Sequence, residues 1–510
     1  IEEGDVLALQ GYISRLPEKP VVTVHLDSVG GRMQEAMALG RYFHRAKIRT
    51  MISSQGKCIS ACGLAFLGGR DPATGKPYRV KSSMGRLGYH AFQTDYRPRD
   101  YTAKNMAEAV AHGMAIRYTK HMGVVYDRRW VKTVEEFFGW RASVETYLRN
   151  VEPLARVGLV YSQQTGRFYG GDRAEEKVED HILGMYQALE EARIPFEMVH
   201  DHNLDADHLA PFKTLILPNT AALSDAQCRE IRAFVEHGGS LVATFETSLY
   251  DEWGARRPTF GLADLFGVDA AGAVEGPLNN TYLTVERDAN GRIHPLLAGL
   301  EHAGRIVYGI YRQPVQPQML FAETPLTLVP SYPDLPMEEL YPRQPRTNIA
   351  EVYLRHVGRG RVVYFPWDID RCFWEVLDVD HGLVLGNAVR WATNEEPMVT
   401  VEGPGQVDIA VWRQQRSITV NLVNLNNPMT MRGPYRELMP SPEQIVHLRL
   451  PDGERAEGVR LLRCGRTPVW QARDGCVTVT VPSILDLEIV AVDLAATTGA
   501  QQRNKETVSQ

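Results

Sequence analysis

The sequence predicts a multidomain protein of the α/β plus β class, and three observations support this. Its 510 residues are too many for a single hydrophobic core, so we expect three or four domains. Strand-like and helix-like segments alternate over residues 20–67 and again over 155–246, which is typical of parallel sheets. Beyond residue 397 apolar residues recur with a period of two and without helices, which predicts a β-sandwich over residues 398–494.

The first α/β segment lies in a predicted domain over residues 1–120. The run "VVTVHLDS" predicts a strand, "RMQEAMALGRYF" a helix, "KIRTMIS" a second strand, and Cys62 to Phe66 the start of a buried helix. Two strand–helix units with short joints predict a parallel sheet. The residues expected on the buried face of the longer helix are Met33, Met37, Gly40 and Phe43.

A helical connector is predicted over residues 121–152, followed by a second α/β domain over 153–397. The strands of that domain are "ARVGLVYS", "PFEMVHD", "KTLILPN" and "SLVATFE". A helix over 172–193 separates the first two, and a helix with a capping box at Ser224 and Gln227 precedes the last. This βαβαβ order predicts a doubly wound, flavodoxin-like sheet.

The sequence also predicts the elements that complete this domain and the tail that ends the given chain. The run "AEVYLRHVGRGRVVYFPWD" predicts a hairpin, and "VDHGLVLGNAVRWATN" a closing helix. The motif "VGRGR" in that hairpin is either an anion site or simply its turn. Residues 250–350 predict irregular insertions with short strands, and residues 495–510 a disordered tail with almost nothing to bury.

Composition limits the possible partners. The formal net charge of −6 and the absence of a basic run argue against nucleic-acid binding. No window of about 18 apolar residues predicts a membrane span. The six cysteines are too sparse for a disulfide framework, so we expect free thiols, with a Cys464–Cys476 bond on adjacent strands as the alternative, and no metal ion or cofactor. The chain opens with Ile, so we expect its natural start to lie upstream, and the compartment, cytoplasmic or periplasmic, stays open.

The run "GKCISACGLAFLGG" places Ser60 between two cysteines. A serine hydroxyl becomes a nucleophile only with a base within reach and hydrogen-bond donors for the oxyanion. Ser60 follows a predicted strand and begins a helix, where backbone N–H groups are free. The candidate base is His90 in "RLGYHAF", and Gly30 and Gly31 are candidate oxyanion donors.

These motifs, "DSVGG", "CISACGLAFLGG" and "LGYH" in that order, resemble the Clp protease proteolytic subunit and Clp-like periplasmic proteins of crotonase type. The resemblance covers residues 1–95 and implies a serine hydrolase with Ser60 and His90 as catalytic residues. Val29 replaces a usual Pro, and the acid partner of His90 is unknown, with Asp95, Asp100 and Asp127 as the nearby acids. The alternative is that Ser60 and its neighbours only pack a helix against a sheet.

A second resemblance covers residues 124–494. The runs "RVGLVYSQQTGRFYGG", "KTLILPNTAALSDAQCREIRAFVEHGG" and "VVYFPWDIDRCFWEVL" look like the region after the catalytic barrel of certain glycoside hydrolases. That region is similar to the β-galactosidase trimerisation domain of family 42, which has a class I glutamine amidotransferase-like fold. The resemblance implies a homo-oligomer, with a trimer favoured. Pro218 and Asn219 stand where an amidotransferase carries its cysteine, so we expect no amidotransferase activity.

Aromatic residues beside carboxylates follow two strands of this domain, at the edge where doubly wound sheets bind ligands. Rings can stack on the C–H faces of sugars while acids accept hydroxyl hydrogens, so these residues are candidate carbohydrate contacts. The alternative is that the tryptophans are core or interface anchors and the acids cap helices. The candidates are Glu246, Trp253, Trp367, Asp368, Asp370 and Trp374.

Three hypotheses of function follow. The first is a carbohydrate-associated accessory and oligomerisation protein, derived from a glycoside hydrolase without its barrel, because a barrel takes about 250 residues and only the helical connector resembles part of one. The second is a serine peptidase or hydrolase that uses Ser60 and His90. The third is a non-functional chimera of two unrelated pieces.

Overall fold

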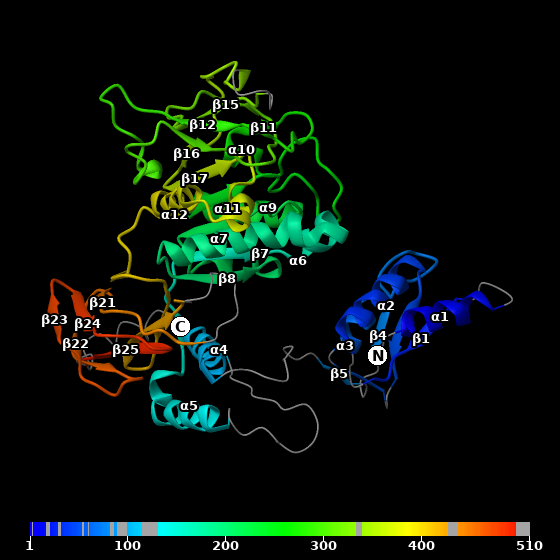
Figure 1. Ribbon diagram of the computed structural model, residues 1–510, viewed down its shortest axis with the longest axis horizontal. Coiled ribbons are helices and arrows are strands. Elements are labelled where there is room, and N and C mark those ends of the chain that lie inside the picture. The colour runs from blue at the N-terminus through cyan, green and yellow to red at the C-terminus, as the bar shows by residue number, and fades with distance from the viewer. Residues whose placement is uncertain are drawn as a thin grey trace, which may run out of the picture. The chain divides into compact units, whose positions relative to one another are not determined.

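The computed structural model describes residues 1–2, 4–16, 21–28, 32–53, 56–59, 61–81, 86–88, 99–114, 131–332, 339–426 and 437–495. The chain divides into two compact units, Ile1–Tyr96 and Arg97–Gln510, which are described separately (Figure 1). Of the helices in the described ranges, none has the length and apolarity that crossing a bilayer requires.

The first unit is a small α/β structure with parallel strand pairs. The strands β1, β2 and β4 form one sheet, and β3 pairs with β5, all in parallel register. This confirms the parallel α/β character predicted for the segment. Its elements are α1 (Asp5–Ser14), β1 (Thr23–His25), α2 (Met33–Arg45), β2 (Arg49–Ile52), β3 (Lys57–Ile59), α3 (Ala61–Leu67), β4 (Arg79–Lys81) and β5 (Arg86–Gly88).

Helix α2 packs through a face slightly different from the one predicted. Its buried residues are Ala36, Leu39 and Phe43, whereas Met37 is 40% exposed. Gly40 is required there, because a Cβ would lie 2.9 Å from the backbone oxygen of Leu64 in α3. The two helices therefore meet backbone to backbone, and the contact turns Met37 away.

The second unit is built around a six-stranded sheet in the order β16-β17-β10-β9-β7-β8. Five strands are parallel and have the order 2-1-3-4-5 when numbered along the chain, while β16 joins antiparallel through the predicted hairpin. The strands are β7 (Val157–Tyr161), β8 (Phe196–His200), β9 (Thr214–Leu217), β10 (Ser240–Thr244), β16 (Tyr353–Val357) and β17 (Gly360–Phe365).

Helices cover both faces of this sheet (Figure 1). Neighbouring residues of one strand enter opposite cores: Ile216 packs with α7, α11 and α12, and Leu217 with α9 and α10. Because both faces are buried, the strands read as continuous apolar runs. The predicted capping box of α9 is present at Ser224 and Gln227. The helices are α7 (Asp180–Glu191), α9 (Asp225–Glu236), α10 (Ala263–Phe266), α11 (Ile369–Val376) and α12 (Val379–Thr393).

Short strands fill the predicted insertion between residues 250 and 350. Two small antiparallel sheets form there, β11 with β14, and β12 between β13 and β15. Their bounds are β11 (Val268–Ala270), β12 (Tyr282–Val285), β13 (Arg305–Val307), β14 (Val315–Pro317) and β15 (Leu326–Val329).

The C-terminal region consists of two antiparallel sheets whose facing side chains share one core, which confirms its all-β character. The sheets have the orders β18-β21-β24-β23 and β22-β25-β20-β19-β6. The strands are β6 (Glu152–Pro153), β18 (Val399–Glu402), β19 (Val407–Arg413), β20 (Ser417–Asn424), β21 (Gln444–Arg449), β22 (Ala456–Leu461), β23 (Trp470–Arg473), β24 (Cys476–Val481) and β25 (Leu487–Leu494).

Helices α4 (Arg99–Ala111) and α5 (Val131–Ser143) cover the other face of the five-stranded sheet. The indole of Trp412 in β19 donates to the backbone oxygen of Ala111 at 2.8 Å, and that of Trp140 in α5 to Leu462 at 2.8 Å. Every residue of β20 is buried as a result. The sequence groups residues 99–111 with the first α/β domain, but their helix packs on the C-terminal sheet.

Candidate functional site

The carboxyl ends of the parallel strands bring several polar residues together, as the fold requires. We call this region the carboxyl edge of the six-stranded sheet. The turns after β9 and β10 are tight, with positive φ angles at Asn219 (37°), Phe245 (50°) and Ser248 (65°). Asn tolerates this left-handed conformation better than most residues, which explains its place directly after Pro218.

A buried hydrogen-bond chain links the elements at this edge. His181 Nδ1 in α7 lies 2.7 Å from Asp370 Oδ1 in α11. The Thr244 hydroxyl donates to Asp370 Oδ2 at 2.7 Å and accepts from the Asn219 backbone N–H at 2.8 Å. The Asn219 amide donates to the Lys177 backbone oxygen at 2.8 Å. Asp370, one of the predicted sugar contacts, is thus fully engaged inside the protein.

Glu246 belongs to the same network and is only 5% exposed. Its backbone N–H donates to Asn219 Oδ1 at 3.1 Å, and its carboxylate accepts from Tyr169 at 2.5 Å and Tyr250 at 3.0 Å. Burial, together with the Glu246 charge, raises the pKa of both phenols, so they remain neutral donors. With both oxygens occupied, Glu246 holds the two tyrosines in place.

Trp253 is the exposed member of the predicted set, with 67% of its surface accessible. It sits in a turn in which Asp251 Oδ1 accepts from the backbone N–H groups of Trp253 (3.0 Å) and Ala255 (2.8 Å). Its ring meets Phe168 edge to face at 5.3 Å between centroids. Gly254 is required, because a Cβ there would lie 2.2 Å from the Phe168 backbone oxygen. Two solvent-accessible rings are therefore held side by side at this edge.

The remaining predicted sugar contacts lie deeper. Trp367 is completely buried, stacks on Tyr308 and donates to the Glu351 backbone oxygen at 2.9 Å. Asp368 accepts from the backbone N–H groups of Ile310 and Tyr311 and from Arg371, each at 3.0 Å. Trp374 is half-buried on α11. The structure thus brings Glu246 and Asp370 into one network and leaves Trp253 as the accessible ring.

The predicted hydrolase residues Ser60, His90, Gly30 and Gly31 lie outside the described residues. The described residues on either side of Ser60 are Ile59, the last residue of β3, and Ala61, the first residue of α3.

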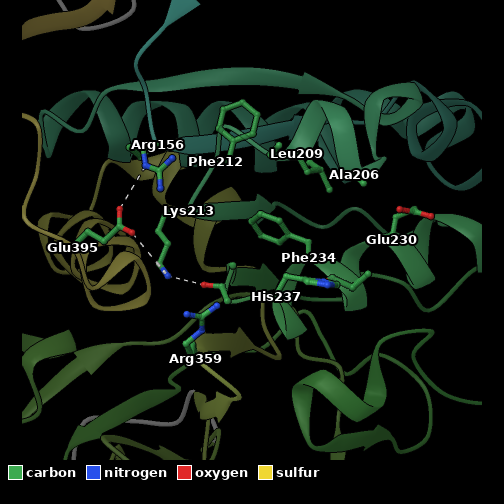
Figure 2. Close-up of a pocket in the computed structure, with 14 residues that line it drawn as sticks. Arg156, Ala206, Leu209, Phe212, Lys213, Glu230, Phe234, His237, Arg359 and Glu395 are labelled. Atoms are coloured by element: carbon green, nitrogen blue, oxygen red, sulfur yellow. Dashed lines mark hydrogen bonds and ion pairs between the residues drawn. The ribbon is translucent and has the colours of Figure 1, made fainter. Parts of the chain in front are cut away.

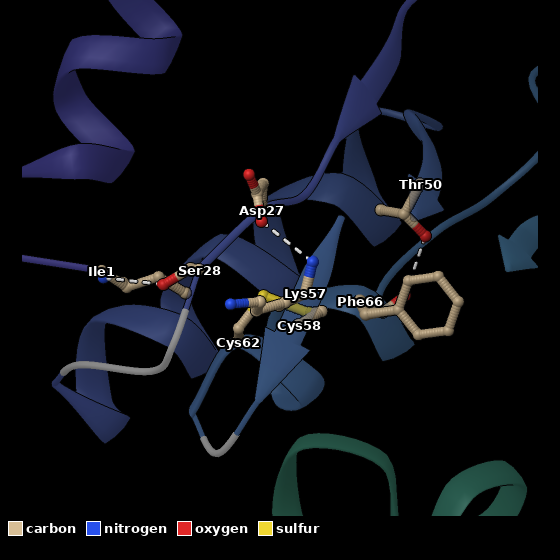
Figure 3. The surroundings of a disulfide bond; sticks show 8 residues. All are labelled: Ile1, Asp27, Ser28, Thr50, Lys57, Cys58, Cys62 and Phe66. Carbon is tan, nitrogen blue, oxygen red and sulfur yellow. Dashed lines mark hydrogen bonds between the residues drawn. A yellow bond between two sulfur atoms is a disulfide. The ribbon is translucent and has the colours of Figure 1, made fainter. Parts of the chain in front are cut away.

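Cys58 and Cys62 form a disulfide across this junction, with Cα atoms 5.1 Å apart (Figure 3). The prediction of free thiols is wrong for this pair, because the strand-to-helix turn brings two cysteines four residues apart within bonding reach. It is confirmed for Cys228, Cys372, Cys464 and Cys476.

A cavity of about 570 Å³ opens at the opposite, amino edge of the six-stranded sheet. Figure 2 shows Arg156, Lys213 and Arg359 around it, and Arg359 belongs to the "VGRGR" hairpin. Glu395 lies 3.5 Å from Arg156 and 4.0 Å from Lys213, so two of the three cations already have an anionic partner. The hairpin interpretation of the motif is confirmed by the pairing of β16 with β17.

The sequence marks Asn219 and the run that contains Glu246 and Tyr250, but it gives no sign of their neighbours Tyr169 and His181. These two residues come from other segments and reach this edge only in the folded sheet, so spacing along the chain gives no signal for them. The positive φ of Asn219 after a Pro is the one local feature that marks the turn.

Comparison with known proteins identifies the region that contains this edge. Residues 155–272 match the family model described as the Beta-galactosidase trimerisation domain. No curated protein matches the chain.

Three solved structures have a similar fold. The α-L-fucosidase isoenzyme 2 from Paenibacillus thiaminolyticus is 17% identical, with a TM-score of 0.61, and the match covers 93% of this chain and 65% of that one. The β-galactosidase from Bacillus circulans sp. alkalophilus is 14% identical, with a TM-score of 0.52, and the match covers 80% of this chain and 60% of that one. The β-galactosidase from Rahnella sp. R3 is 15% identical, with a TM-score of 0.50, and the match covers 79% of this chain and 52% of that one. The chain spans less than two thirds of the length of each of these three structures.

The similarity of residues 1–95 to Clp-type peptidases has no counterpart in these matches and stays a prediction. The second resemblance is confirmed over residues 155–272, which match the β-galactosidase trimerisation domain. The solved structures named above, an α-L-fucosidase and two β-galactosidases, share the fold of the chain.

Proposed function

We propose that the chain is a carbohydrate-associated accessory and oligomerisation protein rather than a glycoside hydrolase in its own right. The observation that carries this proposal is the trimerisation-domain match together with the exposed Trp253–Phe168 pair at the carboxyl edge of the same domain. A closed homo-oligomer, with a trimer favoured, is the assembly that such a domain suits.

The topology supports assigning residues 153–397 to a flavodoxin-like, class I glutamine amidotransferase-like domain and 398–494 to a β-sandwich. The parallel strands have the 2-1-3-4-5 order of that fold type. Asn219 occupies the turn after the central strand, and its amide has no nucleophilic character. The domain is therefore proposed to act by binding and assembly, not by amide hydrolysis.

The state of the carboxylates supports a role without glycosidic cleavage. Glycoside hydrolysis uses two carboxyl groups that flank the sugar bond and remain open to it. Glu246 and Asp370 are instead buried and saturated by Tyr169, Tyr250, His181 and Thr244. In the described part of the first unit the sheets have three and two strands, not the eight of a catalytic barrel.

Trp253 is the proposed contact with carbohydrate. Its ring is presented by a tight turn and supported by Phe168, so little side-chain freedom is lost when a ligand stacks on it. In an oligomer, such a projecting ring can reach a sugar bound by a neighbouring molecule. A pyranose C–H face is the chemical partner that an open indole face suits.

Two measurements test the proposal. Size-exclusion chromatography with light scattering should give a closed oligomer, with a trimer expected, and a strict monomer would contradict the assembly role. Titration with galactosides should change the chemical shift of the Trp253 indole N–H. The Trp253→Ala variant should lose binding, whereas Tyr341→Ala, which removes another exposed ring (54% accessible), should retain it.

A serine hydrolase is the second candidate, favoured by the succession of β3, which ends at Ile59, and α3, which begins at Ala61. A fluorophosphonate probe would then label the wild-type protein but not Ser60→Ala. Absence of labelling in the folded wild-type protein would reject it.

A further inference from the structure

A second cluster of chemically active side chains lies at the end of β8, the edge strand of the six-stranded sheet. The strand ends at His200, and Asp201–Asn203 forms a single 3-10 turn. One donor atom each from His200, Asp201 and His202 lies within 4.8 Å of the other two. The sequence predicts no metal ion, and the strand "PFEMVHD" is predicted without a ligand role for His200 or Asp201.

Asp201 is the buried member of this cluster, with an exposed fraction of 2%. Its Oδ2 accepts from the Ser162 hydroxyl at 3.0 Å and from the Gln164 backbone N–H at 2.8 Å, which fixes the carboxylate. Its Oδ1 has no hydrogen-bond donor among the residues that the structure describes. A buried carboxylate oxygen without a donor is costly, so a cation or proton is expected beside it.

His200 points its Nδ1 at this oxygen from 2.9 Å. The same nitrogen accepts from the backbone N–H of His202 at 3.2 Å, which requires a lone pair on it rather than a proton. That lone pair is occupied by the His202 N–H, so an ion between Nδ1 and Oδ1 would replace this contact of 3.2 Å. Ligands at tetrahedral angles with bonds of about 2.0–2.1 Å lie roughly 3.3–3.4 Å apart, so the two atoms need to separate by only a few tenths of an ångström to share an ion.

His202 supplies the third ligand. Its ring stacks on that of His200, with centroids 4.9 Å apart and planes 22° apart, and it is exposed on the turn. A rotation of this exposed side chain brings its nitrogen to the ion without disturbing the fold. Ser162 and Gln164 already hold Asp201 as outer-shell partners hold ligating carboxylates.

We propose that His200, Asp201 and His202 bind one divalent transition-metal ion of the Zn²⁺ type. Two imidazoles and one carboxylate are the ligand set that such borderline ions prefer, whereas Mg²⁺ and Ca²⁺ prefer oxygen ligands alone. Three protein ligands leave one or more coordination positions open to water or to a ligand from another molecule.

The test uses the full chain, stripped of metal with a chelator, titrated with ZnCl₂ by calorimetry and with CoCl₂ by visible absorption. We expect one equivalent per chain and Co²⁺ bands typical of nitrogen and oxygen ligands. His202→Gln and Asp201→Asn should each weaken binding by at least about tenfold. Asp201→Asn should fold normally, because an Asn amide can donate to His200 Nδ1.

The matched control is His208→Gln, which removes an exposed histidine that contacts Asp205 at 2.8 Å in the next turn. It should bind Zn²⁺ like the wild type. Absence of saturable Zn²⁺ and Co²⁺ binding by the wild-type protein would overturn the proposal. Wild-type affinity in both His202→Gln and Asp201→Asn would also overturn it, since the ion would then lie elsewhere.

Discussion

A His–Asp pair lies beside the turn after β9, and another lies within the turn after β8 of the same sheet. The two pairs differ in how many of their polar atoms have hydrogen-bond partners. Near Asn219, His181 and Asp370 are buried, and each of their side-chain polar atoms has a protein partner. After β8, Asp201 is equally buried, yet its Oδ1 has no donor among the described residues and both imidazoles reach solvent. Hydrogen-bond satisfaction, not residue type, separates a structural network from a candidate binding site.

The largest expected effect is at Asp370. Asp370→Ala leaves His181 and Thr244 buried without their acceptor, so we expect a loss of about 3–5 kcal/mol in the free energy of unfolding. Urea denaturation measures it, and Asp370→Asn should cost less because it keeps one acceptor. A loss below about 1 kcal/mol would show that the network near β9 is not structural.

The next largest effect is expected for Asn219→Ala, which should lower the free energy of unfolding by about 2–3 kcal/mol. The side chain accepts from Glu246 N–H and donates to Lys177, and its φ of 37° is unfavourable for Ala. Asn219→Gly relieves the strain without restoring the hydrogen bonds. Thermal unfolding of the two variants separates these contributions, and equal melting temperatures would mean that the backbone strain is negligible.

A third pair, His112 and Asp408, tests the intermediate case, because the His112 side chain is 26% exposed. Burial alone would lower its pKa, but the Asp408 hydrogen bond at 2.7 Å and nearby negative charges raise it overall. A raised pKa in the folded state contributes stability below about pH 6.5 that is lost as the pH rises through the raised value.

The wild type should therefore exceed His112→Gln by up to about 1 kcal/mol at pH 6, and the difference should shrink by pH 8. Denaturation of both proteins at several pH values measures it. A difference that stays constant from pH 6 to pH 8 would contradict the assignment of a charged histidine in this pair.

The smallest effect is expected at Asp201. In metal-free protein, Asp201→Asn should change the free energy of unfolding by less than about 0.5 kcal/mol, because the NH₂ group replaces the oxygen that has no donor, while the amide oxygen, in the place of Oδ2, keeps the Ser162 and Gln164 contacts. Thermal denaturation with and without ZnCl₂ checks this, since only the wild type should gain stability from the ion. A large loss in metal-free protein would place Asp201 in the same structural class as Asp370.

Local patterns predicted much of the fold. Period-two runs gave β19, β20 and β25, and the Ser224–Gln227 capping box gave the start of α9, because these signals lie within a few neighbouring residues. The four-residue strands β18 and β23 were missed because few residues carry their pattern, and β22 was missed because Gly458 weakens its alternation of apolar and polar side chains. The cover of the C-terminal sheet by α4 was missed because its partner strands lie far away in the sequence.

The candidate site was less predictable for the same reason. The sequence identifies the aromatic and acidic residues that follow β10 and β17. Whether such a residue can contact a ligand depends on its exposure, and only the folded structure shows that Trp253 is exposed while Trp367 is buried. The Cys58–Cys62 bond and the unsatisfied oxygen of Asp201 likewise depend on how turns place neighbouring side chains.

The cover that α4 and α5 give to the five-stranded sheet has a consequence for biosynthesis. The ribosome makes both helices long before β19, β20 and β25. The apolar faces of the helices therefore stay without their partner sheet while the domain between them is synthesised. The C-terminal sheet can close only after β25 has been synthesised. A chaperone that shields these two helices on the nascent chain would therefore raise the yield of native protein.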